Sequence, residues 1–506
     1  MGLPGPFGSR YRVRSTVNRI ILLESFLRVT NLKNQVFRGV LWRFAEQFGT
    51  QVISFAVSVI LARILGPEEF GTVALLTIFL ALSSCLVNSG FGMALIQKKD
   101  ADDLDFNSVF YLSLALSALL FGALWFSAPV IAGFYGKPVL ISVLRVSAIK
   151  LIFDGLNGVQ NAVLARQMLF NRSFWITLSG TFVGGVMGIW MAYSGFGIWS
   201  LVWSSLAGGF VSTAVRWFLI RWRPAFQFSW QRLKGLFAFG SRMLGVSLLD
   251  TFFTQIYGLL IGKWYSASDL AYFNRGEHLP QMAMNSIQGS IGSVVFPALS
   301  KMQDDKAKLK SAMRKVMKTS SFIVFPMMFG LAAVAKPLIL VLISEKWLPA
   351  VPYMQLACLS YAFWPIHVAN LQAIQACGRS DIILNLEMIK KILLLVVLFV
   401  TFKYGVLAIA LGRLFIAPLG VYINSFPNKR LIGYSQAEQL RDLSPEFILS
   451  VFMAGVAWSM SLIFENTVFQ LMSGVVSGLV VYVFGALVIR RSLVLSVLQK
   501  MRCGIQ

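Results

Sequence analysis

Charged residues are scarce in this sequence, which excludes an ordinary water-soluble globular protein. Only 13% of the 506 residues are charged, whereas 57% are hydrophobic. A soluble domain carries roughly 25% charged and about 45–50% apolar residues. Acidic residues are the scarcer kind, because 21 Asp and Glu stand against 45 Lys and Arg, a net charge of +24. Such a charge invites a nucleic-acid-binding interpretation, but the apolar content argues against nucleic acid as a partner and indicates an integral membrane protein.

Residues that build metal, disulfide and nucleotide sites are also few. The four cysteines show no CxxC spacing, so neither a disulfide framework nor a zinc site is indicated. The two histidines, His278 and His367, lie far apart. Segment 258–263 ends in Gly-Lys but lacks the spacing of a nucleotide-binding P-loop. We therefore expect no cofactor and no metal. The basic N-terminus also lacks the features of a cleaved signal peptide, so we expect it to be retained.

Long apolar runs are abundant, and they predict an all-α integral membrane protein with about 14 transmembrane helices. A bilayer core about 30 Å thick needs roughly 20 apolar residues per helix. The runs lie near residues 37–64, 70–96, 107–134, 139–165, 174–194, 197–220, 236–262, 271–299, 320–344, 350–376, 382–403, 405–426, 446–465 and 469–489.

Lysine and arginine alternate between the loops, and this alternation supports the span count and predicts the orientation. Short cytoplasmic loops collect these residues. With the N-terminus inside, the outer loops carry only five of them, namely Arg63, Lys137, Lys263, Lys346 and Lys403. Both termini are therefore expected in the cytoplasm. We interpret most of the net charge as a topological signal.

The expected domains follow from the span count and from the polar breaks. They are a basic cytoplasmic segment (1–35), an N-lobe of six helices (36–222), a C-lobe of six helices (223–430), two further helices (431–489) and a basic tail (490–506). Within the first segment, residues 15–34 suit a helix that lies on the anionic inner leaflet. A disordered basic tail is the alternative.

A shift of 200 residues aligns the two lobes. Leu61–Arg63 then matches Ile261–Lys263, and Glu69–Gly71 matches Asp269–Ala271 in charge, size and apolar character. Because six spans separate the two segments, both lobes enter from the same side of the membrane. The pattern predicts a parallel repeat about an axis along the membrane normal; chance similarity between apolar sequences is the alternative.

Ionisable residues inside the spans are the candidate site. A charge at the centre of a membrane helix costs about 2.5–3.5 kcal/mol on insertion scales, so such residues usually mark a cavity or pathway. The basic candidates for substrate binding are Arg43, Arg145, Lys150, Arg242, Arg275 and Arg413. The acidic candidates for ion pairing or proton coupling are Glu46, Asp154, Asp250 and Glu277. The basic excess predicts an anionic, phosphate-bearing substrate, since guanidinium groups bind phosphate in a bidentate manner.

Two candidate pairs share a helix face. Arg43 and Glu46 are three residues apart near the cytoplasmic end of the first span, where snorkelling to the headgroups is an alternative explanation. Lys150 and Asp154 are four apart near mid-membrane, and a cavity-lining role is favoured over a structural clamp.

Three further patterns have structural interpretations. Segment 272–280 combines polar residues with a proline and predicts a broken or kinked helix that enters a cavity. Glu387 with Lys390 and Lys391 is interpreted as an interfacial anchor. The Gly180, Gly184 and Gly188 spacing predicts close helix packing and no site.

Several segments resemble bacterial polysaccharide flippases of the Wzx type. Leu61–Gly71 is similar to an outer-loop signature of these proteins. Leu270–Pro280, followed by Val295–Asp305, looks like the branch associated with colanic acid and other exopolysaccharides. Glu345–Trp347 with Ala350–Pro352, and Ala376–Asp381, are further matches. The resemblance covers roughly residues 36–430.

The resemblance implies membership of the multidrug/oligosaccharidyl-lipid/polysaccharide exporter superfamily, whose proteins form a V-shaped cavity between two six-helix lobes. It implies a transporter and no enzyme. The expected substrate is an undecaprenyl-diphosphate-linked repeat unit, moved from the inner to the outer leaflet of the bacterial inner membrane by alternating access for exopolysaccharide or lipopolysaccharide biosynthesis. The expected partners are the bilayer, this lipid-linked oligosaccharide and, further, polysaccharide polymerase and chain-length proteins.

Related flippases use arginines on their first, second and eighth helices around the diphosphate. Arg43 and Arg275 match the first and eighth helices by position. The second span, 70–96, has no basic residue, so that contact is either absent or supplied by the fourth or seventh span.

Two other functions compete with the flippase. A cation-coupled multidrug exporter of the same superfamily would favour an acidic lining, whereas the lining expected here is basic. A membrane-embedded polysaccharide polymerase or ligase would need a sizeable outer loop with catalytic groups, and the expected outer loops are short.

Overall fold

A computed structural model describes residues 38–39, 41–88, 90–300, 302–303 and 305–489, and every regular element in this part of the chain is a helix. A backbone within hydrocarbon must satisfy its own hydrogen-bonding groups, and a helix does so within each segment. The helix considered for residues 15–34 and the tail 490–506 lie outside the described residues.

Short connections join the helices. The first helix is Leu41–Ile64. It is followed by α2 (Pro67–Leu75), α3 (Thr77–Asn88), α4 (Phe91–Gln97), α5 (Asp103–Tyr135), α6 (Val139–Ser147), α7 (Lys150–Arg166), α8 (Phe170–Tyr193), α9 (Ile198–Leu219), α10 (Trp230–Trp264), α11 (Ala267–Ser300), α12 (Lys306–Ala333), α13 (Ala335–Leu342), η1 (Glu345–Ala350), α14 (Val351–Ala362), α15 (Trp364–Ala376), α16 (Ser380–Thr401), η2 (Phe402–Tyr404), α17 (Val406–Ile432), α18 (Gln436–Ser461) and α19 (Thr467–Ile489).

Each expected span coincides with one helix or with helices in direct succession, which confirms the all-α membrane fold. Among the described residues, ten helices are long and apolar enough to cross a membrane by themselves. The other passes are α6–α7, α11, α14–α15 and α16. Two of these are interrupted and two carry several charges. Passes α6–α7 and α11 each lie between apolar passes in sequence, and α14–α15 with α16 lie as a pair between α12–α13 and α17. Their lower hydropathy therefore does not mean that these passes lie outside the membrane.

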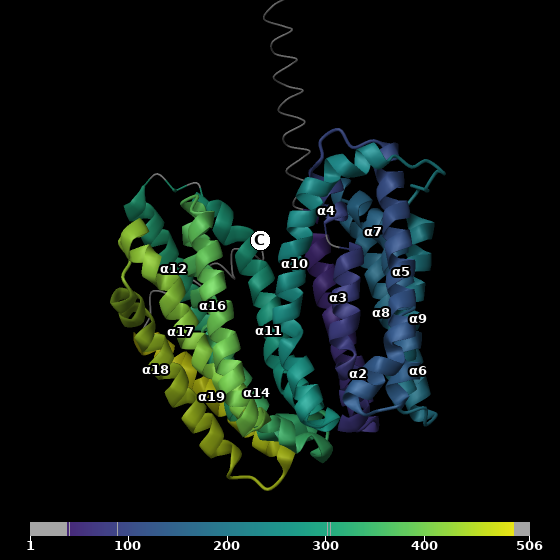
Figure 1. Cartoon of the computed structure of the whole chain (residues 1–506). Coiled ribbons are helices and arrows are strands. Elements are labelled where there is room, and N and C mark those ends of the chain that lie inside the picture. The colour runs from purple at the N-terminus through teal and green to yellow at the C-terminus, as the bar shows by residue number, and fades with distance from the viewer. Residues whose placement is uncertain (1–37, 40, 89, 301, 304, 490–506) are drawn as a thin grey trace, which may run out of the picture.

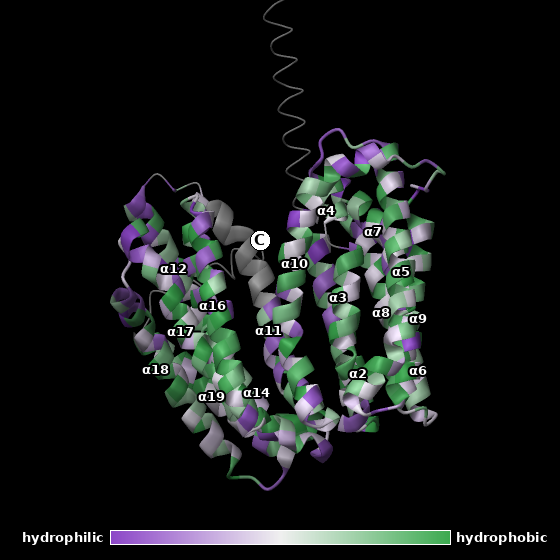
Figure 2. Cartoon of the chain, in the orientation of Figure 1, coloured by the Kyte–Doolittle hydropathy of each residue, from purple (hydrophilic) through white to green (hydrophobic). Residues whose placement is uncertain are grey.

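The helices form two groups that α10 and α11 join. Figure 1 shows α2–α9 in one group and α12–α19 in the other, with α10 and α11 between them. Helix α10 packs along α3, α4 and α5, and α11 packs against α2 on one side and α14 and α15 on the other. In Figure 2 apolar residues dominate the long helices, and hydrophilic residues gather at the helix ends and along α10 and α11. The lobe boundaries at 222 and 430 stay predictions.

The 200-residue repeat has a structural counterpart in the turns that follow the first helix and α10. The backbone N–H of Gly66 donates to Glu69 Oε2 at 2.9 Å, and that of Ser266 donates to Asp269 Oδ2 at 3.1 Å. Each carboxylate lies three residues after the residue that it caps and stabilises the free N–H groups at a helix start. The same local structure therefore recurs at equivalent positions of both halves.

The five basic residues expected outside the membrane lie in loops that contact one another at one end of the molecule. Lys137 Nζ lies 2.7 Å from Glu68 Oε1, and Lys346 Nζ donates to the Arg63 carbonyl at 3.3 Å. The backbone N–H of Gly405, next to η2, donates to the Tyr265 hydroxyl at 2.9 Å. These contacts agree with the alternation on which the span count rests.

Helix α11 corrects one expectation. The sequence predicts a broken or kinked helix at residues 272–280. The helix is not broken there, because α11 is helical from Ala267 to Ser300. Pro280 removes one backbone donor, and a proline ring inside a helix crowds the carbonyl four residues earlier, which here belongs to Gly276. A Cβ at Gly276 would lie 2.6 Å from Tyr353 Cβ. The packing of α14 against this turn therefore supports a continuous helix.

The glycines of α8 pack as expected. A Cβ at Gly184 would lie 2.6 Å from the Ser204 carbonyl oxygen and 3.1 Å from Gly208 Cα on α9. The absence of side chains lets the two backbones approach closely, which stabilises helix pairs in lipid, where no hydrophobic effect drives their association.

We predict that Gly184→Ala lowers the free energy of unfolding by about 1–3 kcal/mol, because the added methyl group must push α9 away. The midpoint of thermal unfolding in detergent measures this. Gly122→Ala on α5 is the matched control, since a Cβ there meets nothing within 4 Å. Equal midpoints for the two variants would contradict the packing account.

Candidate functional site

Two cavities flank α10, and Asp250 borders both of them. The N-half cavity, of about 700 Å³, lies between α3, α7, α9 and α10. The C-half cavity, of about 610 Å³, lies between α10, α11, α14–α15, α16 and α17. The four passes that are interrupted or rich in charge all contribute lining residues to these cavities. Polar residues of these passes, among them Lys150, Glu277 and Lys391, therefore face protein cavities.

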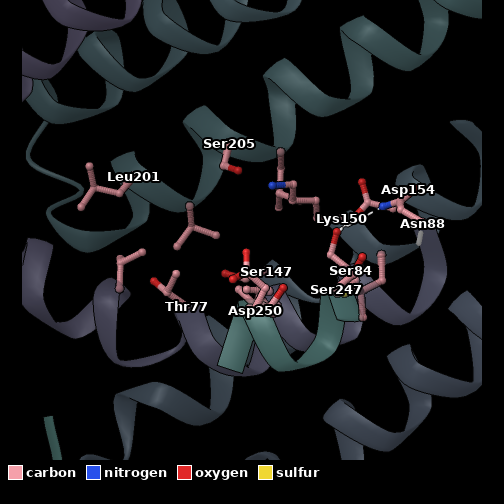
Figure 3. A pocket seen from close by; sticks show the side chains of 18 residues that line it. Thr77, Ser84, Asn88, Ser147, Lys150, Asp154, Leu201, Ser205, Ser247 and Asp250 are labelled. Atoms are coloured by element: carbon pink, nitrogen blue, oxygen red, sulfur yellow. Dashed lines mark hydrogen bonds between the residues drawn. The ribbon is translucent and has the colours of Figure 1, made fainter. Parts of the chain in front are cut away.

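The N-half cavity combines one lysine, two carboxylates and many hydroxyl groups. Figure 3 shows Lys150, Asp154 and Ser84 near one another, with Asp250 among the lining residues. Ser84 Oγ donates to Asp154 Oδ2 at 2.7 Å, and Asn88 Nδ2 donates to Ser84 Oγ at 3.2 Å. Among the described residues, no ion pair joins Lys150 to Asp154, so the two share a cavity without forming a clamp. The exposed ammonium group of Lys150 can meet an anion there.

The C-half cavity contains three cation–carboxylate pairs. Arg413 on α17 pairs with Glu277 on α11. Lys391 Nζ on α16 lies 3.5 Å from Asp250 Oδ1 on α10. Lys390 Nζ lies 2.6 Å from Glu387 Oε1 on the same helix. Two of these pairs thus connect α10 and α11 to α16 and α17.

Aromatic rings surround these cations. The Arg413 guanidinium lies 5.0 Å from the ring centroid of Tyr257, and Lys391 Nζ lies 4.8 Å from that of Phe253. A ring face attracts a cation by its negative quadrupole. Paired charges and rings lower the cost of removing the cations from water. The carboxylate partner leaves some donors of Arg413 available, because a guanidinium has five N–H groups and one carboxylate accepts at most a few hydrogen bonds.

The structure separates several candidates that the sequence grouped together. Arg43 is largely exposed, 3.3 Å from Glu46, and the Glu46 carboxylate accepts hydrogen bonds from Ser173 and Thr177 of α8 at 2.8 and 2.9 Å. Glu46 therefore fastens the first helix to α8. Fifteen residues, or about 22 Å of helix, separate Arg43 from the Ser58 hydroxyl that Arg275 binds.

The remaining basic candidates also lie apart from the lining. Arg145 Nε donates to the Trp125 carbonyl at 3.2 Å, and its guanidinium lies 4.9 Å from the Trp125 ring. Arg242 is exposed on α10. As far as the described residues define the two cavities, Arg145, Arg242 and Arg275 border neither of them. Lys150 and Arg413 are the basic candidates that do.

The sequence does not identify Lys390 and Lys391 as lining residues, because its pattern favours an interfacial anchor that they form with Glu387. All three line the C-half cavity. The signal was present in their spacing. Residues 387, 390, 391 and 394 follow the i, i+3, i+4, i+7 pattern of one helix face, and all four line the cavity.

The chain matches known proteins over most of its length. Residues 60–352, more than half of it, match a family model described as polysaccharide biosynthesis protein. The chain belongs to this family. It is 27% identical to the succinoglycan biosynthesis transport protein ExoT of Rhizobium meliloti (strain 1021), over 92% of this chain and 96% of the relative. It is 22% identical to the lipopolysaccharide biosynthesis protein WzxC of Escherichia coli (strain K12), over 86% and 89%.

Solved structures show the same fold. The inward closed conformation of the lipid II flippase MurJ superposes with a TM-score of 0.73 over 90% of this chain and all of that one, at 15% identity. An inward-facing multidrug transporter of the MATE family superposes with a TM-score of 0.59 over 75% and 95%, at 17% identity. The fold of these transporters, with its two sets of helices, is therefore confirmed for the polysaccharide biosynthesis protein described here.

We predict that Arg413→Met destabilises the protein by about 3 kcal/mol, because Glu277 is left without its partner among the helices. The double variant Arg413→Met/Glu277→Gln should recover most of the loss, since neither residue then carries a charge. Thermal unfolding midpoints of Arg413→Met, Glu277→Gln and the double variant give the coupling between the two residues. Additive losses would contradict the pairing.

Proposed function

We propose that this protein is a flippase that moves an undecaprenyl-diphosphate-linked polysaccharide repeat unit from the inner to the outer leaflet of the bacterial inner membrane. The observation that carries the proposal is the lining of the C-half cavity by Lys390, Lys391 and Arg413, in a chain of the polysaccharide biosynthesis family. The likeness to proteins named for polysaccharide transport and for lipid II flipping supports it.

The proposed mechanism uses the cations for the diphosphate and leaves the polyprenyl tail in the bilayer. A diphosphate in hydrocarbon bears a large desolvation cost, which fixed cations offset. Lys150 in the N-half cavity and Arg413, Lys390 and Lys391 in the C-half cavity supply these charges. Asp250 and Glu277 keep Lys391 and Arg413 paired between turnovers. Asp250, at the border of both cavities, is placed to exchange partners as the halves move.

The cation-coupled multidrug exporter is the second candidate, because solved multidrug transporters share the fold. Cationic drugs need an excess of acidic groups in the binding cavity. The C-half cavity instead balances three basic groups, Lys390, Lys391 and Arg413, against three carboxylates and adds His367. An anionic headgroup can replace a carboxylate as the partner of one of these basic groups. The lining therefore favours an anionic headgroup.

Orientation and partners complete the proposal. The concentration of basic residues on one side supports cytoplasmic termini, since positive residues stay inside. The loops of Arg63, Lys137, Lys263, Lys346 and Lys403 then face the outside. A polysaccharide polymerase and chain-length proteins would use the product there.

We predict that Lys390→Met/Lys391→Met in cells whose own copy is deleted lowers polymer export at least about tenfold, because two cations are lost from the cavity. The lipid-linked repeat unit should accumulate, with the protein at normal levels in the membrane. Lys403→Met, at a lysine outside both cavities, is the control and should export normally. Normal export by the double variant, or a change in drug resistance with unchanged export, would contradict the proposal.

A further inference from the structure

Arg275 lies in an aromatic cage between the two halves of the molecule. Its guanidinium is 4.6 Å from the ring centroid of Phe70 on α2 and 4.9 Å from that of Trp347 in η1. Arg275 Nη1 also donates to Ser58 Oγ of the first helix at 2.6 Å. Within the described chain, no carboxylate lies within ion-pair distance of this guanidinium. The cation is therefore held by two rings and one hydroxyl group, and three separate elements meet on it.

The same region joins the first helix to α13 and η1 by reciprocal capping. The last carbonyls of a helix have no partner within the helix, and the helix dipole makes that end negative. Trp347 Nε1 donates to the Ala62 carbonyl at 2.9 Å, and Lys346 Nζ donates to that of Arg63 at 3.3 Å. In return, Arg63 Nε donates to the Leu342 carbonyl at the end of α13, at 2.7 Å. Each half thus satisfies the carbonyls of the other.

The repeat contains a second bond of the same kind. Lys263 is equivalent to Arg63 under the 200-residue shift, and its Nζ donates to the carbonyl of Phe134 near the end of α5. Helix α5 is the third pass of the first set of six, and α12–α13 is the third pass of the second set. The basic residue that ends the first pass of each half therefore binds the end of the third pass of the other half. The two bonds are related by the repeat, so they form a matched pair of contacts between the halves and neither is an isolated contact.

Close backbone packing seals this end. A Cβ at Gly71 on α2 would lie 1.8 Å from the carbonyl oxygen of Ala267 at the start of α11. Trp347 is completely buried and belongs to the same apolar cluster as Ala62 and Ala271. The end of the first helix is thus packed into the core of the second half.

We propose that Arg275, with Ser58, Arg63, Phe70, Lys346 and Trp347, forms an outer latch that closes the external side of the transport pathway and must open in each cycle. In this role Arg275 acts on the equilibrium between conformations and does not contact the substrate. The inference rests on the proposed flippase function and orientation. When the latch opens, water can solvate the released carbonyls and the Arg275 cation, and this makes opening reversible. An apolar seal would instead expose only hydrocarbon.

The test measures opening as the access of a thiol reagent to one site, and transport is not measured. Ala271→Cys places a thiol one turn before Arg275 at a site that is 3% exposed, and a membrane-impermeant maleimide added to intact cells reports its access from outside. Trp347→Phe keeps a ring but removes the donor to Ala62, and Arg275→Lys keeps the charge but removes the planar stack. Each should raise the labelling rate about threefold to tenfold, because each weakens the closed conformation by a cation–π contact or hydrogen bond.

Two controls make the result decisive. Arg145→Lys alters the same kind of arginine–tryptophan contact, 4.9 Å from Trp125, but within one half, and should leave labelling of the Ala271→Cys thiol unchanged. Ala369→Cys, 2% exposed in the core of the second half, reports unfolding and should remain unlabelled. Unchanged labelling of the Ala271→Cys thiol in both latch variants would overturn the proposal. Equal rises at both introduced thiols would also overturn it, since they would show general loosening. Because labelling needs no substrate, neither outcome depends on which substrate is moved.

Discussion

A charged side chain among membrane-spanning helices needs a partner or water, and the structure of this protein depends on how that need is met. Insertion of an unpaired charge costs at least about 2.5–3.5 kcal/mol. Ten helices of the described chain are apolar enough to cross by themselves, although two of them, α10 and α17, carry Asp250 and Arg413. The polar passes meet the constraint by facing inward, where Arg413 finds Glu277 and Lys391 finds Asp250. The candidate binding chemistry is therefore concentrated in the helices that are least suited to face lipid.

The same constraint links the cavities to the contacts between halves. Helix α10 separates the two cavities and carries Asp250 into both, while it packs along α3, α4 and α5 of the first half. The first helix contacts α8 through Glu46 and α11 through Ser58. The leading helix of each half is thus bonded to the other half. A movement of one half relative to the other must change these bonds and the lining of both cavities together.

Much of the fold could be predicted from the sequence, because hydrophobic runs of the right length and the alternation of basic loops are read without tertiary information. The repeat was also visible, since Glu69 and Asp269 perform the same local capping. The site was predicted less well. Spacing along one helix indicates which residues share a face, but not whether that face meets lipid, a cavity or another lobe. Lys390 and Lys391 were therefore assigned to the membrane interface, and Arg275 was grouped with cations from which the structure separates it.

We infer that these charged cavities serve the passage of a diphosphate-linked saccharide across the bilayer. The most direct measurement reconstitutes the purified chain in liposomes with undecaprenyl-diphosphate-linked glucose and adds a membrane-impermeant sugar oxidant outside. We expect the oxidised fraction to rise beyond the outer-leaflet share found in protein-free liposomes and to approach the whole pool, since a flippase returns inner-leaflet substrate to the outside. An oxidised fraction equal to that of protein-free liposomes, with correctly folded protein present, would contradict the account.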